Sequence, residues 1–219
     1  MLSEERIGEN YNKYIELLQT NIHREGIENL IKWLNAQDTK VAPASGKYHC
    51  AYKGGLVEHS LNVYKRLKNL LKLEYTIKTK DETTGEIKVE NKCPYSEETI
   101  ALVALLHDIS KINYYEIQYK NVKDEMGAWQ QVPYYQVKEN KLVFGSHCMN
   151  SLYMTSKFFK LNYEEELAIL YHMGPMDGTD DKITIKNTSE VYSKSPLALL
   201  LHHADMEATY IDESRTTNE

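Results

Sequence analysis

The sequence predicts an all-α fold, a helical bundle that carries a β-hairpin insertion around residues 112–144. Two observations support this prediction. Over most of the chain, apolar residues recur at a spacing of three or four, which is typical of helices that bury one face. Residues 112–144 change to a spacing nearer two and are rich in tyrosine around a Met126-Gly127 turn, which indicates a hairpin.

The first half of the chain is expected to form four helices. They cover about residues 3–20, 25–36, 56–73 and 96–106. Ser96 is a suitable N-cap for the fourth helix. Residues 100–106 are apolar all round, so this helix is expected to be buried on every side. The segment 37–49 is expected to be a loop, and the polar segment 74–95 an exposed hairpin or loop.

The second half is expected to form three more helices after the hairpin. They cover about residues 146–160, 163–172 and 189–210. The segment 173–187 is expected to be a loop, and the polar tail after Asp212 is expected to fray. The predicted organisation is therefore N-terminal helices over 1–42, one domain over 43–211 and a polar tail over 212–219.

The composition limits the classes of protein that fit. The 219 residues suit one domain, and 42% apolar residues exclude a disordered chain. The 26 Lys and Arg against 32 Asp and Glu give a net charge of −6, which argues against general nucleic-acid binding. The longest apolar stretches, such as 99–106 and 197–201, fall short of the roughly 20 residues that span a membrane, and no signal peptide is expected. Cys50, Cys93 and Cys148 show no CxxC pair, so free thiols and a cytoplasmic location are expected.

Ionisable side chains interrupt the apolar helical segments at five places. They are His59, the pair His107-Asp108, His147, His172 and Asp205. Burying a carboxylate is costly unless it is paired or bound to a metal, so these side chains are expected to converge. Imidazole nitrogen with carboxylate oxygen suits a first-row transition metal or zinc, and magnesium less well. A single buried histidine is more often a hydrogen-bonded core residue, so the ordered series carries the prediction.

The order of this series, H…HD…D, resembles the HD-domain metal-dependent phosphohydrolase superfamily. Residues 45–60 (SGKYHCAYKGGLVEHS) resemble the segment around the first ligand in its 3′-to-5′ exoribonuclease branch. Residues 105–111 (LLHDISK) resemble the "LHDIGK" stretch of that branch, 144–147 its "LLGH" element and 171–174 its "SHHG" element. The resemblance covers about residues 43–210 and implies an HD-domain helical bundle.

The resemblance also implies a metal centre. Its ligands would be His59, His107, Asp108 and Asp205 for a first ion, with Asp108 bridging to a second ion held by His147 and His172. Asp108 and Lys111 would be the catalytic residues, with Lys111 and His49 on the substrate side. A solvated lysine and an ordinary loop histidine remain the alternatives for Lys111 and His49. Met173 replaces the second histidine of the branch, and methionine is a poor ligand for such ions.

The implied function is that of a cytoplasmic phosphohydrolase of the phosphodiesterase or nucleotidase type. It would cleave a phosphoester of a nucleotide, cyclic nucleotide or short oligonucleotide by a hydroxide that one or two cations activate. Mn, Fe, Ni, Co and Zn suit the ligand set better than Mg. The expected partner is a phosphorylated small molecule or short oligonucleotide, with no membrane contact, and the oligomeric state stays open.

Two other classes of function stay open. A catalytically weak HD scaffold could bind a nucleotide or regulate a partner, although it would have no need of all six ligands. A di-iron oxygenase uses a similar His/Asp set, although Lys111 favours phosphate chemistry. Substrate selectivity is expected from the hairpin 112–144 and the loop 173–187 with Asp177, Asp180 and Asp181. The hairpin tyrosines would either stack on a base or simply pack the hairpin.

Overall fold

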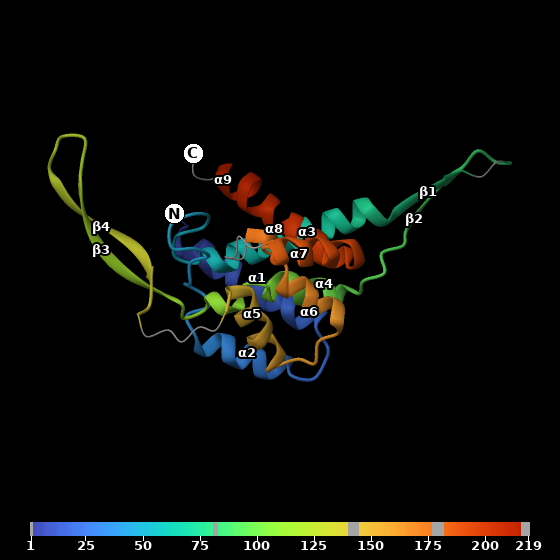
Figure 1. Cartoon of the computed structure of the whole chain (residues 1–219), viewed down its shortest axis with the longest axis horizontal. Helices are drawn as coiled ribbons and strands as arrows, with labels where there is room; N and C mark the ends of the chain where they lie inside the picture. The colour runs from blue at the N-terminus through green and yellow to red at the C-terminus, as the bar shows by residue number, and fades with distance from the viewer. Residues whose placement is uncertain (1, 81–82, 140–144, 177–181, 216–219) are drawn as a thin grey trace.

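The computed structural model describes residues 2–80, 83–139, 145–176 and 182–215. Helices form the body of the molecule (Figure 1). The longer ones are α1 (Glu4–Asn21), α2 (Ile27–Ala36), α3 (Gly55–Tyr75), α4 (Glu97–Leu106), α5 (His147–Ser156), α6 (Tyr163–Leu170), α7 (Lys182–Lys194) and α8 (Pro196–Glu207). The short ones are η1 (Ile109–Lys111), η2 (Gly174–Met176), the π-helix η3 (Ala208–Asp212) and α9 (Glu213–Arg215). None of the described helices is both long and apolar enough to cross a membrane.

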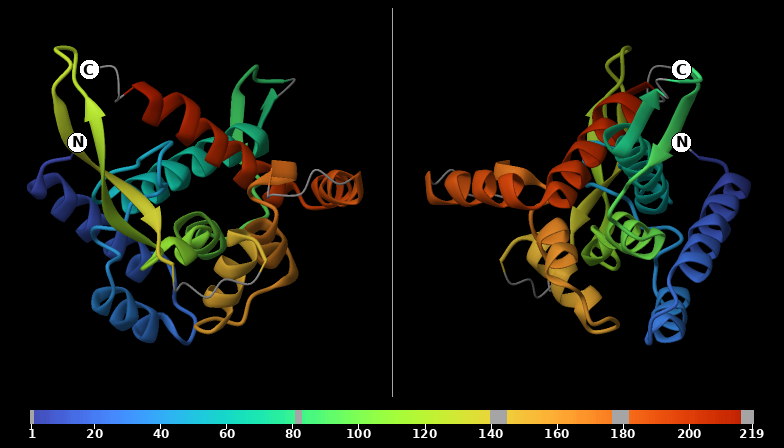
Figure 2. Two further views of the ribbon diagram at one scale, coloured as in Figure 1. Left: turned by 60° about the vertical axis from the view of Figure 1, so that its left-hand side comes forward. Right: turned by 90° about the vertical axis from the view of Figure 1, so that its right-hand side faces the viewer.

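The core is built around α4, as its uniformly apolar sequence predicts. All residues of this helix from Thr99 to Leu106 are buried, and the helix packs against α1, α3 and α6. Helix α8 packs across α3 and α6 (Figure 2). The Tyr14 hydroxyl of α1 donates to the carbonyl oxygen of Leu105 over 3.0 Å. The carboxyl end of α4, where His107 and Asp108 follow, therefore lies inside the bundle.

The mostly helical prediction is confirmed, and the N-cap of α4 lies where the sequence indicates. The Ser96 hydroxyl accepts from the Thr99 N–H at 3.1 Å and begins α4. The predicted single helix over 189–210 is wrong, because α7 ends at Lys194 and α8 begins at Pro196. Proline has no N–H to donate to the preceding turn, so it begins a helix but does not continue one. The predicted loop over 173–187 is also only partly correct, since α7 already begins at Lys182, and Asp177, Asp180 and Asp181 lie outside the described residues.

Two antiparallel hairpins project from opposite sides of the helical body (Figure 1). The polar segment 74–95 forms β1 (Thr76–Lys80) and β2 (Ile87–Asn91), and the insertion 112–144 forms β3 (Tyr115–Lys123) and β4 (Trp129–Val137). Residues 140–144 of the predicted insertion lie outside the described part. Most side chains of β3 and β4 are exposed, including Tyr119 at 64% and Trp129 at 68%. These aromatic residues are therefore not buried against the helical body.

A tight turn brings the loop before α3 against the beginning of that helix. Cys50 has a left-handed backbone with φ of 45°, and Gly54 has φ of 82°. A Cβ atom on Gly55 would lie only 2.0 Å from the Cys50 carbonyl oxygen, so only glycine allows this approach. The turn places His49 beside His59 of α3, with ring centroids 4.8 Å apart.

The chain after Asp212 is not simply a frayed tail. Glu213 is 5% exposed, and its carboxylate accepts from His59 Nδ1 over 2.9 Å. The prediction of fraying fails here because a buried histidine supplies the carboxylate with a partner. The buried site therefore extends beyond residue 211, where the predicted domain ends.

Candidate metal centre

His59 lies at the centre of one cluster of buried ionisable groups. Helix α3 buries it completely, with Nε2 3.1 Å from Asp205 Oδ1 and Nδ1 2.9 Å from Glu213 Oε1. Burial alone would lower the pKa of His59, but the Glu213 and Asp205 carboxylates outweigh it and raise that pKa to about 10. Ion pairing with His59 holds the pKa of Asp205 below its usual range, against the effect of burial. Two carboxylates thus meet one imidazole in a site shielded from water.

His107 joins this cluster from the carboxyl end of α4. Its Nδ1–H donates to the Ala104 carbonyl over 2.9 Å, so the lone pair of a neutral ring lies on Nε2. That nitrogen is 3.3 Å from His59 Nε2 and 3.4 Å from Asp108 Oδ2. Burial lowers the pKa of His107, which favours the neutral ring. A neutral imidazole whose outer nitrogen is fixed by a carbonyl is the usual form of a metal-ligating histidine.

Asp108 lies between this cluster and a second one. Its Oδ2 accepts from Lys111 Nζ over 2.6 Å, while Oδ1 lies 3.6 Å from both His147 Nε2 and His172 Nε2. Oδ1 is buried and has no hydrogen-bond partner among the described residues. Burial would raise the pKa of Asp108, but Lys111 and the surrounding histidines hold it well below its usual value. An ionised, buried oxygen without a hydrogen bond is costly, and a cation bound by this oxygen and the two imidazoles would offset the cost.

The second cluster is formed by α5 and the end of α6. His147 begins α5, and His172 follows α6 with its Nδ1–H donating to the Ile169 carbonyl over 2.7 Å. Burial lowers the pKa of His147 to about 3, which keeps its ring neutral. For His172, burial is outweighed by Cys148 and Asp108, and the pKa is raised well above its usual value. Both Nε2 atoms lie 3.6 Å from Asp108 Oδ1, so these three atoms form a second possible position for a metal ion.

The structure thus brings all six predicted ligands together; their role as ligands stays a prediction. Among the described residues, three groups could each hold an ion, with ligand atoms within 4.8 Å of one another. They are His59, His107 and Asp108; His147, Cys148 and His172; and His49, His59 and Glu213. Bonds of about 2.0–2.2 Å to nitrogen or oxygen leave two ligands of one ion roughly 3–4 Å apart, as the 3.6 Å separations are. The donor set therefore fits a divalent transition metal or zinc.

Lys111 and His49 both lie at this site. The Lys111 side chain is 12% exposed and paired with Asp108, so it is not an ordinary solvated lysine. Burial lowers the pKa of His49 to about 4, and its Nε2 is buried with no hydrogen-bond partner in the described part of the chain. His202 supports the site from outside, since its Nδ1–H donates to the His172 carbonyl over 2.7 Å.

Two residues of the site could not be found from the sequence. Glu213 falls in a polar stretch with no periodic pattern. Cys148 reads as one of three free thiols, yet its sulfur lies 3.8 Å from His172 Nε2 and 3.9 Å from His147 Nε2. The only sequence signal for Cys148 is its position directly after His147. Because Met173 is a poor ligand, Cys148 is the more suitable additional donor beside His147 and His172.

Glu213→Gln is expected to weaken metal binding by about 10- to 100-fold, because the carboxylate orients the His59 ring and increases its basicity. The affinity can be measured by competition of Mn²⁺ or Zn²⁺ with a chelating indicator. Glu207→Gln, on a carboxylate bonded to Arg66, is the matched control and should leave the affinity unchanged. An unchanged metal affinity in Glu213→Gln would show that Glu213 does not contribute to metal binding.

Comparison with known proteins identifies one family. The model of the HD domain matches residues 56–209. The matched segment contains all six predicted ligands and Lys111, and it excludes His49 and Glu213. No curated protein and no solved structure matches the chain.

Proposed function

The chain belongs to the HD domain family, a family of metal-dependent phosphohydrolases, and we propose on this premise that it hydrolyses the phosphoester of a nucleotide, cyclic nucleotide or short oligonucleotide. The observation that carries the proposal is Asp108 Oδ1, ionised and buried without a hydrogen bond between His147 and His172. The resemblance of residues 45–60 and 105–111 to the exoribonuclease branch supports a nucleotide-containing substrate. The three free cysteines support a reducing compartment such as the cytoplasm.

Each part of the site would have a separate task. Bound cations would lower the pKa of water and offset charge on the phosphoryl oxygens. His59, His107, Asp108 and Asp205 would hold one ion, and Asp108, His147 and His172 a second. The Ala104 and Ile169 carbonyls fix two of the imidazoles before any ligand binds, so the donors need not reorganise. Lys111 supplies the positive side chain nearest to Asp108 and would bind a non-bridging phosphate oxygen.

Activity should depend on the metal. Chelator-treated protein is expected to be inactive towards bis(p-nitrophenyl) phosphate, mononucleotides, cyclic nucleotides and dinucleotides, and to recover when Mn²⁺, Fe²⁺, Co²⁺, Ni²⁺ or Zn²⁺ is added. Hydrolysis that survives chelation, or none with any ion, would contradict the proposal. Metal binding without turnover would favour the binding-module alternative, and oxygen consumption by the iron form would favour the oxygenase.

Lys111→Met is expected to lower kcat by about 10²- to 10³-fold, because it removes a preorganised charge from the position of the phosphate. Lys13→Met, in an exposed pair with Glu16, is the matched control. Metal content of both variants should be measured alongside, since Lys111 also contacts Asp108. A Lys111→Met protein that keeps its metal and its turnover would exclude Lys111 from the reaction.

A further inference from the structure

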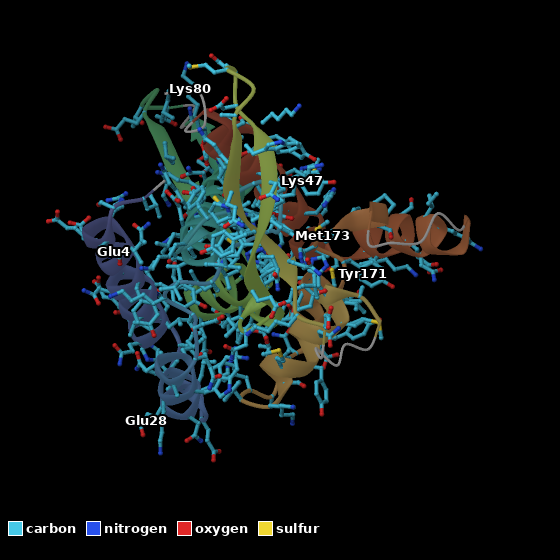
Figure 3. All side chains as sticks on the ribbon, turned by 90° about the vertical axis from the view of Figure 1, so that its left-hand side faces the viewer. Glu4, Glu28, Lys47, Lys80, Tyr171 and Met173 are labelled. Carbon is cyan, nitrogen blue, oxygen red and sulfur yellow. The ribbon has the colours of Figure 1, made fainter. Side chains whose placement is uncertain are left out.

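A cavity of about 460 Å³ opens directly beside the candidate metal centre. Asp205, Glu213 and His49 form the side of the cavity that it shares with the metal centre. Met173 and Tyr48, which lie far apart in the sequence, also line it. Figure 3 shows Met173 and Lys47, the neighbour of Tyr48, on the side of the body where the β3–β4 hairpin lies. The volume lies within the range of about 300–1,000 Å³ that is typical of small-molecule sites.

Both walls of the cavity have unusual backbone geometry. One wall is the π-helix η3, which carries Thr209 and Tyr210 to the cavity and leads to Glu213 beside His59. Wide helical turns of this kind are rare and often occur at functional sites. The facing loop carries Tyr48 and ends at Cys50, a residue other than glycine with positive φ. Strained backbone of this kind is also concentrated at ligand sites.

The chemistry of the cavity differs from that of the adjoining metal centre. Met173, Met206, Tyr48 and Tyr210 supply flat or flexible apolar surface. Tyr48 is 81% exposed, with Lys47 Nζ 6.0 Å from its ring centroid, and it can stack on a planar group. Among the described lining residues there is no lysine or arginine. The charged groups at its inner end are the carboxylates of Asp205 and Glu213, both engaged by His59. The cavity therefore favours an uncharged, largely apolar group and disfavours additional phosphates.

We propose that this cavity binds the alcohol part of the substrate, an uncharged planar group of about nucleoside size, while its phosphate lies at Asp108 and Lys111. This inference rests on the proposed function and narrows it to phosphoesters with a single phosphate. Nucleoside polyphosphates are expected to be poorer substrates, because the described lining of the cavity offers their outer phosphates two carboxylates and no lysine or arginine. In the hydrolysis, the oxygen of water bonds to phosphorus and the P–O bond to the alcohol breaks. The leaving oxygen takes up a proton from the water, and the alcohol then leaves the cavity.

The first test compares three substrates of the metal-loaded protein. Adenosine 5′-monophosphate is expected to exceed ribose 5-phosphate and adenosine 5′-triphosphate in kcat/KM by at least about tenfold each, which is a modest discrimination for an apolar pocket. Equal values for the monophosphate and ribose 5-phosphate, or preference for the triphosphate, would overturn the inference. Either result would leave the proposed hydrolysis itself intact.

The second test changes the cavity wall. Met206→Ala is expected to raise KM for adenosine 5′-monophosphate about tenfold, with KM for ribose 5-phosphate and kcat unchanged. Thr209→Lys should move the preference towards the triphosphate, because it adds a cation to a lining whose described residues include no lysine or arginine. Tyr163→Ala removes a large side chain that is 73% exposed at the beginning of α6, outside the lining of this cavity, and serves as the control. Equal loss on all three substrates in Met206→Ala would indicate general disruption and contradict a role in selectivity.

A third test does not depend on turnover. Adenosine, which has no phosphate, is expected to raise the melting temperature of the wild-type protein and not that of Met206→Ala or Thr209→Lys. If no phosphoester is cleaved but adenosine still binds in this way, the proposed function fails and the cavity assignment stands. If phosphoesters are cleaved but adenosine gives the wild type no shift, the cavity assignment fails alone.

Discussion

Asp108→Asn should lower phosphoester turnover by at least about 10³-fold while the helices remain folded. The carboxylate lies between the two halves of the site, with Oδ2 bonded to Lys111 and Oδ1 facing His147 and His172. Asparagine has nearly the same shape but carries no charge, so it cannot balance the cations of either half. The measurement is kcat of the metal-loaded variant, with circular dichroism as the check on folding.

A matched control tests whether the loss of turnover is specific to Asp108 or follows from replacing an aspartate elsewhere in the protein. Asp124 lies in the turn between β3 and β4, where it accepts from the Ala128 N–H over 2.9 Å. Asp124→Asn should keep wild-type turnover, because asparagine can accept the same bond and the turn lies outside the site. Turnover within a few-fold of wild type in Asp108→Asn would exclude the bridging role.

Arg24→Met should lower the free energy of unfolding by about 3–5 kcal/mol, the largest effect on stability expected away from the site. Its guanidinium donates over 3.0 Å to each oxygen of Glu165, whose side chain is completely buried, and it also pairs with Glu98. Glu165 further accepts from Thr99 at the start of α4 and caps α6 through Asn162. Without Arg24 the buried carboxylate loses its only charged partner among the described residues.

Urea denaturation of Arg24→Met and of the control variant Arg6→Met measures the loss in the free energy of unfolding. Arg6→Met removes a cation of the same type from a pair with Glu9 in which both side chains are 59% exposed, and it should change stability by less than about 1 kcal/mol. A loss below about 1 kcal/mol in Arg24→Met would show that water or another group replaces the arginine.

The helical body could be predicted because its signals are local. The uniformly apolar run of α4, the Ser96 cap and the interrupted apolar helices are each recognised from residues that lie within a few positions in the sequence. The ionisable residues could be grouped for the same reason, since each contradicts its apolar surroundings. The sequence predicts one helix over 189–210, although Pro196 marks the break between α7 and α8, because the apolar pattern resumes directly after the proline.

The remaining parts of the site depend on contacts between distant segments. Glu213 lies in a polar stretch, and only the folded chain shows that it meets His59. The same holds away from the site for Arg24, whose contact with Glu165 joins distant segments. Selectivity is expected from the hairpin 112–144 and the loop 173–187, and of these two segments the described lining of the cavity contains Met173 of the loop and no residue of the hairpin. That lining comes from Met173, the Tyr48 loop and η3, whose π-helical turn has no signature in the sequence.

The metal content of the purified protein is the most direct test of the candidate metal centre. Elemental mass spectrometry of the wild type should find about two equivalents of transition metal if both halves of the site bind, or about one if Met173 leaves the second half weak. Asp108→Ala should lose most of this metal, because Asp108 contacts both halves. No metal in the wild type, even after incubation with Mn²⁺ or Ni²⁺, or equal content in Asp108→Ala, would contradict the account.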